Sequence, residues 1–192
     1  MSSKLALFIH LRSFFKTIKI VLKGGPDMLF RDELTGLFTR RIFKELALEM
    51  LKQAMRSNMP ISVMMADMDG LRKANNTYGH GKGDELLRLS AGIFMDCVRT
   101  SDIVGRRGGD EFIILFPDTS LSGAAAVGEK LKSLLHRNGL EWSFGVAEAC
   151  FPNESELSHR TKNSIEEYWK SFLESLIDEA DSRLYQNKPE RR

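Results

Sequence analysis

The first hydrophobic pattern in the chain is helical. Its apolar positions advance in alternating steps of four and three residues, which is the spacing of a coiled-coil seam. They are Leu7, Leu11, Phe14, Ile18 and Val21. Gly24-Gly25-Pro26 ends the pattern, so we expect an amphipathic helix over residues 4–22. Fewer than three heptads leave three alternatives open: a helix packed on its own domain, a dimer stalk, or a helix lying on a membrane surface.

Helical and strand patterns alternate along the rest of the chain. Apolar positions at helical spacing predict helices over 39–57, 84–98, 120–137 and 165–187, the last with an interruption left open. Short apolar or alternating runs predict strands over 61–66, 102–107, 110–116 and 140–149. Between the first strand and the second helix lies a polar, glycine-bearing stretch, residues 67–83, and residues 152–164 are polar and loop-like.

The two middle strands are separated by Gly108-Gly109. We expect these glycines to form a two-residue hairpin turn, because both can adopt positive φ. The resulting order is β-α-β-β-α-β with helices before and after, which predicts an α+β sandwich of the ferredoxin-like or polymerase-palm type. We divide the chain into a basic head and linker, residues 1–29, and one folded domain, residues 30–192.

Composition narrows the class of protein. The 192 residues are 42% hydrophobic and 28% charged, which indicates a globular chain. The net charge of +2 gives no indication of a broad nucleic-acid-binding surface, although residues 1–23 carry five bases and no acid. No run of 18 uncharged apolar residues exists, so no transmembrane helix is expected. Cys97 and Cys150 lack metal or redox spacing, which predicts reduced thiols in the cytoplasm, and the amphipathic head leaves open a peripheral position at the inner membrane face.

Two acidic clusters occur where a predicted strand meets a turn. Asp67-Met68-Asp69 follows the first strand, and Asp110-Glu111 follows the hairpin glycines. In a β-α-β-β-α-β sheet these strands can be neighbours, and converging carboxylates repel one another unless a cation is present. Hard oxygen ligands favour Mg²⁺, so the pattern indicates metal-assisted phosphoryl or nucleotidyl transfer. The alternative is two separate, solvated acidic turns.

The string Gly108-Gly109-Asp110-Glu111-Phe112 resembles the signature of the GGDEF family, the diguanylate cyclases. Further segments are similar to the family's other motifs, and together they span about residues 30–192. They are Asp32-Glu33-Leu34-Thr35-Gly36-Leu37 with Arg40-Arg41, the block from Asp67 to Asp84, Ser143-Phe144-Gly145-Val146-Ala147, and Ala180-Asp181 with Leu184-Tyr185 and Lys188.

The resemblance implies condensation of two GTP molecules into cyclic di-GMP with release of two pyrophosphates. It implies Mg²⁺ as the cofactor, with Mn²⁺ as a second candidate. Asp67 and Asp110 would be metal ligands together with the Met68 carbonyl. Glu111 would accept the proton of the attacking ribose 3′-hydroxyl or act as a further metal ligand.

The resemblance also implies how the substrate is held. Asn75 and Asp84 would bind the guanine edge, and His80 would lie close to the nucleotide. Lys188 and Arg192, one helical turn apart, would hold the terminal phosphates. Because each subunit of the family holds one GTP, the resemblance implies a homodimer during catalysis.

A second site is implied by Arg99-Thr100-Ser101-Asp102. It is similar to the family's R-x-x-D motif, at which the product inhibits the enzyme, and its alternative is an ordinary surface ion pair. The chain departs from the family pattern at Gly70-Leu71-Arg72, where Phe-Lys is usual and Arg72 keeps the positive charge.

Two competing functions remain at this stage. One is a non-catalytic receptor for cyclic di-GMP or GTP, which the presence of Asp110 and Glu111 disfavours. The other is a cyclase making a mixed or adenine dinucleotide. Asp84 disfavours this second function, because a carboxylate accepts from both N1 and N2 of guanine. We assign no function to residues 150–175.

Overall fold

The computed structural model describes residues 30–152 and 161–189. The helix predicted over residues 4–22 and the terminal Arg192 lie outside this part of the chain. The strands are β1 (Phe38–Thr39), β2 (Ile61–Met68), β3 (Ile103–Gly108), β4 (Glu111–Pro117) and β5 (Trp142–Glu148). The helices are α2 (Arg40–Ser57), α3 (Leu71–Tyr78), α4 (His80–Cys97), α5 (Leu121–Arg137) and α7 (Lys162–Asn187).

The strands form one sheet in the order β1-β3-β4-β2-β5. The four longer strands are antiparallel to their neighbours, and the short β1 adds parallel to β3. Without β1, this is the strand order of a ferredoxin-like sheet. The predicted α+β fold is therefore confirmed.

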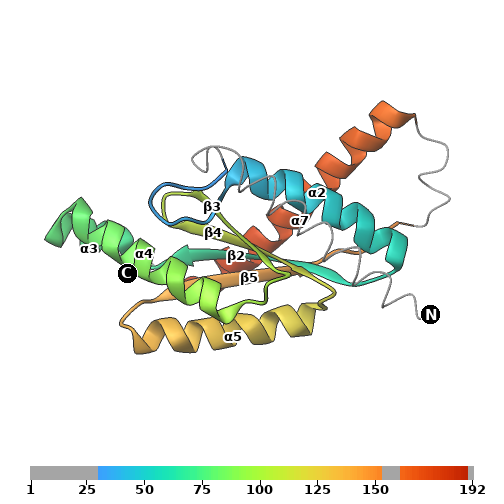
Figure 1. Cartoon of the computed structure of the whole chain (residues 1–192). Helices are drawn as coiled ribbons and strands as arrows, with labels where there is room; N and C mark the ends of the chain where they lie inside the picture. Colours follow the sequence, from blue (N-terminus) through green and yellow to red (C-terminus); the bar gives the residue numbers. More distant parts are fainter. Residues whose placement is uncertain (1–29, 153–160, 190–192) are drawn as a thin grey trace.

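Helices cover both faces of the sheet. Figure 1 shows α2 and α7 above it and α5 below. The central strand β2 is buried along its whole length, and its side chains alternate between two cores. Val63 and Met65 belong to the core between the sheet and helices α2 and α7. Met64 and Ala66 belong to the core on the other face, between the sheet and helices α4 and α5.

Two helices occupy the region predicted to be a polar stretch. Residues 71–78 form α3, and α4 begins at His80 rather than at residue 84. Gly70 and Gly79 have positive φ of 80° and 86°, so each lets the chain turn sharply at an end of α3. Gly81 and Gly83 lie within α4; Gly83 is packed against Asn75 and Leu71 of α3, a contact that offsets its low helical propensity.

The hairpin turn lies one residue later than predicted. Gly108 pairs with Glu111 at the end of the ladder, so Gly109 and Asp110 form the turn. The register shifts between Arg106 and Gly108, which places an extra residue, Arg107, in β3. This bulge keeps Gly108 in the strand, and both glycines have positive φ as expected, 154° at Gly108 and 53° at Gly109.

The C-terminal helix α7 is continuous and lies close against β5. A Cβ on Gly145 would come within 2.1 Å of the Ala180 carbonyl oxygen and the Leu184 nitrogen. Arg183 donates a hydrogen bond of 2.6 Å to the Val146 carbonyl, and Asn187 donates one of 2.9 Å to the Phe144 carbonyl. These bonds occupy carbonyls on the outer edge of the sheet. Within the described ranges no helix is long and apolar enough to cross a membrane, and Cys97 and Cys150 are free thiols.

Replacing Gly145 with Ala should destabilise the fold by about 3 kcal/mol, because the methyl group meets the backbone of α7 and not a flexible side chain. Urea unfolding measures the change. Gly92→Ala is the matched control: nothing lies within 4 Å of its Cβ position, and alanine is favoured in a helix by about 1 kcal/mol. Equal stability of the two variants would contradict the close packing of α7 on β5.

Candidate active site at the acidic end of the sheet

Two predicted site residues lie directly opposite each other on neighbouring strands. Asp67 of β2 pairs in register with Glu111 of β4. The backbone N–H of Met68 donates to the Asp110 carbonyl oxygen at 3.2 Å, which holds the hairpin turn beside the end of β2. The antiparallel pairing of β2 with β4 therefore brings both acidic clusters to one end of the sheet.

Burial and mutual repulsion disfavour charge on these carboxylates. Asp67 is 8% exposed. Burial raises its pKa above 3.8, an ion-paired hydrogen bond from Lys188 opposes this, and the charges of Asp110 and Asp69 raise it further. Burial also raises the pKa of Glu111, against the opposing effect of Arg107. A nearby positive charge relieves this cost.

Two side chains supply that positive charge within the protein. Lys188 Nζ lies 2.8 Å from Asp67 Oδ1. Arg107 Nη1 lies 3.7 Å from Glu111 Oε2 and 3.8 Å from Oδ1 of Asp181, a residue of α7. The two carboxylates predicted to share a cation are thus held in separate ion pairs.

The candidate metal donors at this end of the sheet are carboxylate oxygens of β2 and of the hairpin. In residues 30–152 and 161–189 no three His, Cys, Asp or Glu side chains are already gathered as a metal site. The oxygens of Asp67 and Glu111 nevertheless come from paired strand positions, and the charge of Asp110 acts on both carboxylates. Hard carboxylate oxygens are the ligands that Mg²⁺ prefers. These residues therefore fit a hard divalent cation once their protein counterions are exchanged for it.

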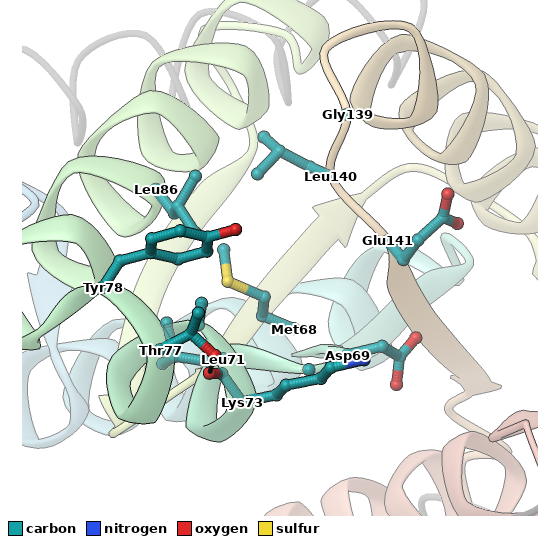
Figure 2. A pocket seen from close by; sticks show the side chains of 12 residues that line it. Met68, Asp69, Leu71, Lys73, Thr77, Tyr78, Leu86, Gly139, Leu140 and Glu141 are labelled. Atoms are coloured by element: carbon teal, nitrogen blue, oxygen red, sulfur yellow. Dashed lines mark hydrogen bonds between the residues drawn. The ribbon is translucent and has the colours of Figure 1, made fainter.

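The third acid of this region, Asp69, makes contacts that are separate from those of Asp67 and Glu111. Its carboxylate accepts a hydrogen bond of 2.8 Å from Ser143 Oγ, and its N–H donates to the Glu141 carbonyl at 2.9 Å. With Met68 it lines a pocket of about 320 Å³ between α3 and the start of β5 (Figure 2). Of the residues that line this pocket, only Met68 has a predicted role at the site, and Asp69 belongs to the first acidic cluster, so the pocket adjoins that cluster.

The predicted guanine-binding residues are brought together by the packing of α3 on α4. Asn75 Oδ1 is buried and, within the described structure, has no hydrogen-bond partner. It lies 1.9 Å from the position a Cβ on Gly83 would take, so Gly83 leaves room for the Asn75 amide. Asp84, which follows Gly83 in the chain, is half-buried. Asn75 therefore packs against the turn of α4 that carries Asp84.

Two further predicted residues lie on the surface of the same helices. His80 is the first residue of α4, and Arg72 lies in the first turn of α3; both are exposed. Their surroundings assign neither a role.

The R-x-x-D segment forms a tight turn between α4 and β3. The Asp102 carboxylate accepts a hydrogen bond of 2.8 Å from the Arg99 N–H, and the Asp102 N–H donates to the Arg99 carbonyl at 3.0 Å. Among the described residues no ion pair joins the two side chains. Burial raises the pKa of Asp102, and the hydrogen bond from Arg99 opposes the shift. Asp102 thus shapes the turn and leaves the exposed Arg99 side chain outside it.

Comparison with known proteins identifies the family. The profile described as "Diguanylate cyclase, GGDEF domain" matches residues 29–192. The chain belongs to the GGDEF family.

Two curated relatives and one solved structure illustrate the similarity. The chain is 29% identical over 188 residues to the response regulator PleD of Caulobacter vibrioides, covering 98% of this chain and 40% of PleD. It is 37% identical over 114 residues to the diguanylate cyclase DosC of Escherichia coli, covering 59% of this chain and 25% of DosC. The diguanylate cyclase SiaD of Pseudomonas aeruginosa, solved with its activator SiaC, superposes with a TM-score of 0.69 at 26% identity, covering 96% of this chain and 66% of that chain. The chain spans less than half the length of these two curated relatives.

One contact of the GGDEF hairpin was not predicted from the sequence. Arg106 donates through Nε and Nη2 to the Gly109 carbonyl, at 3.1 and 2.7 Å, and through Nη1 to Asp32 Oδ1 at 2.9 Å. Asp32 also accepts from the Thr35 N–H and hydroxyl. The opening motif of the domain and the hairpin turn are therefore tied to one guanidinium. Asp32 and Thr35 stood in a matched motif, but no pattern linked them to a base 74 residues away.

Arg107 and Asp181 were also not singled out as site residues. Asp181 lies on α7 seven residues, about two helical turns, before Lys188, which caps the end of that helix. This seven-residue spacing was the sequence feature from which Asp181 could have been predicted as a site residue. Arg107 is the bulged residue of β3, and its contact with α7 depends on the fold.

Replacing Arg106 with Met should lower the free energy of unfolding by about 2 kcal/mol near neutral pH, since hydrogen bonds to charged groups are lost. Burial alone would raise the pKa of Asp32, but hydrogen bonds from Thr35 and Arg106 hold it below 3.8. The stabilisation is therefore present above that pH and is lost as the pH falls through the lowered pKa. In urea titrations the deficit of the variant should narrow as the pH is lowered below 3.8. Arg137→Met, at an exposed position of α5, is the control, and a pH-independent deficit would contradict the assignment.

Proposed function

We propose that this chain is a diguanylate cyclase domain that condenses two GTP molecules into cyclic di-GMP and two pyrophosphates. The observation that carries the proposal is the pairing of Asp67 with Glu111 across β2 and β4, with Asp110 held beside them by its backbone. Membership of the GGDEF family and the similarity to DosC, a named diguanylate cyclase, support it.

Asp67, Asp110 and the Met68 carbonyl would hold Mg²⁺, or Mn²⁺ in its place. When bound, the metal would neutralise negative charge on the triphosphate as it develops in the transition state. Glu111 would accept the proton of the ribose 3′-hydroxyl or complete the metal shell. Its raised pKa suits proton transfer, because a base works best when its pKa approaches the operating pH.

The base of the substrate would be selected between α3 and α4. Asp84 accepts hydrogen bonds from N1 and N2 of guanine, a donor pair that adenine lacks. The neighbouring Asn75 offers an amide with both donor and acceptor atoms. We therefore assign GTP, and not ATP, as the substrate. His80, at the start of α4, would lie close to the nucleotide.

The triphosphate would be held by cationic side chains. Lys188 stands at the end of α7 against Asp67 and would reach a phosphate held by a metal at that carboxylate. Arg72, at the start of α3, would supply the charge that lysine supplies in the family. Arg192 lies outside the described residues, and we propose that it too would hold the terminal phosphates.

Each domain would bind one GTP, so the product would form between two copies of the chain. The residues assigned to one site would bind one GTP with its metal and supply one proton acceptor, Glu111. The second nucleotide therefore has to come from a facing site. We propose a homodimer during turnover and a cytoplasmic location, where GTP is available.

A second candidate is a GGDEF receptor that binds nucleotide without turnover. The ion pairs of Lys188 with Asp67 and of Arg107 with Glu111 favour it, because they neutralise the acidic cluster without a metal. Incubation with GTP and Mg²⁺, followed by chromatography, separates the two functions. Cyclic di-GMP supports the cyclase, whereas GTP that is bound but unchanged supports the receptor. In a parallel incubation with GTP and ATP together, a product containing adenine would overturn the assignment of guanine.

Glu111→Gln should lower cyclic di-GMP formation by at least about a hundredfold, because the amide can neither accept the proton nor offset the positive charge of a metal. GTP binding, measured by equilibrium dialysis, should change much less. Glu129→Gln, an exposed acid on α5, is the control and should retain activity. Turnover by Glu111→Gln within a few-fold of the parent would remove Glu111 from the mechanism.

Arg99→Ala should abolish inhibition by cyclic di-GMP while leaving the initial rate unchanged. Arginine offers two parallel donors to guanine or phosphate, and the turn at Asp102 leaves this side chain exposed. The measurement is the initial rate at increasing product concentration. Lys132→Ala, at another exposed base, serves for comparison. A variant as sensitive to product as the parent would refute the product site.

A further inference from the structure

The two cations at the acidic cluster differ in how closely they hold their carboxylates. Lys188 Nζ is within hydrogen-bond distance of Asp67 Oδ1, at 2.8 Å. Arg107 stays at 3.7 Å from Glu111 and 3.8 Å from Asp181, which is longer than a hydrogen bond. Glu111 is therefore screened by a nearby charge, whereas one oxygen of Asp67 is already engaged.

The surroundings of Asp67 leave little room for a second cation beside the lysine. Its side chain is 11% exposed and that of Lys188 is 24% exposed. A divalent ion and an ammonium on the same buried carboxylate would repel each other at short range, where little water screens them. Metal and Lys188 are thus alternatives at Asp67.

The backbone of α7 does not depend on this ion pair. Arg183 and Asn187 bond to carbonyls of β5, and the helix backbone is packed against Gly145. Lys188 follows as the C-cap residue, its N–H donating to the Tyr185 carbonyl at 3.4 Å. Its side chain can therefore leave Asp67 by rotation alone while the helix end stays in place.

We propose that Lys188 is the counterion of Asp67 in the metal-free protein, and that a divalent cation binding at Asp67 displaces its ammonium, which then becomes free to bind an anionic group of the substrate. The inference rests on the proposed function for the identity of the metal site. It adds a positive coupling: the cation frees the lysine, and an anion that attracts the lysine strengthens cation binding by the same factor.

The first test measures cation binding without any nucleotide. Mn²⁺ is titrated into the full chain, and free Mn²⁺ is followed by electron paramagnetic resonance. Lys188→Met should bind Mn²⁺ at least about fivefold more tightly than the parent, in the usual range of coupling between sites. Lys170→Met removes the same charge from an exposed position of α7 and should bind like the parent. Equal or weaker Mn²⁺ binding by Lys188→Met would overturn the proposal.

The second test follows the lysine first in the unaltered protein, so its main comparison does not depend on how a variant folds. A short pulse of an amine-acetylating reagent, read by mass spectrometry, reports how accessible Lys188 is. Mg²⁺ alone should increase its acetylation and leave that of Lys170 unchanged. In Asp67→Asn, Lys188 should react fast with or without Mg²⁺. Acetylation of Lys188 that is unchanged or decreased by Mg²⁺ in the parent would show that the cation does not displace it.

These outcomes separate the exchange from the proposed function. Cyclic di-GMP production with no effect of Mg²⁺ on Lys188 would refute the exchange and leave the cyclase assignment intact. Displacement of Lys188 by Mg²⁺ without any product from GTP would support the exchange and contradict the cyclase.

Discussion

Repulsion among carboxylates at one end of the sheet is the constraint on which the rest of the structure depends. The pairing of β2 with β4 places Asp67 opposite Glu111 and holds Asp110 beside them. Such a group is tolerated only when positive charge lies close to it. Within the protein that charge is supplied by Lys188 and Arg107.

The C-terminal helix is the element that meets this requirement. It contributes Lys188 directly, and through Asp181 it contacts Arg107 on β3. Its backbone approaches β5 closely only because residue 145 is glycine. Packing at a sheet edge and electrostatics at the acidic cluster are thus linked through one helix. On the other side of the hairpin, Arg106 ties the turn to the opening motif of the domain.

Much of this arrangement could be predicted from the sequence. The apolar run over 61–66, followed by Asp67, and the acidic pair after Gly108-Gly109 predicted two strands that could be neighbours, and the strand order places them side by side. The eight residues of α3 were missed because a short helix between two glycines has too few turns for a clear period. The hairpin turn was misplaced by one residue because the bulge at Arg107 depends on its surroundings in the fold and leaves no periodic signal. Family motifs pointed to Lys188, but its contact with Asp67 joins residues far apart in the chain and required the folded structure.

The central claim, that Asp67, Asp110 and Glu111 serve one divalent cation, is tested most directly by diffraction. Crystals grown with Mn²⁺ and a non-hydrolysable GTP analogue would be measured at the manganese absorption edge. We expect an anomalous peak about 2.1 Å from carboxylate oxygens of Asp67 and of the hairpin acids, as for hard divalent ions. A peak remote from Asp67, with bound nucleotide elsewhere and Lys188 still on that carboxylate, would contradict it.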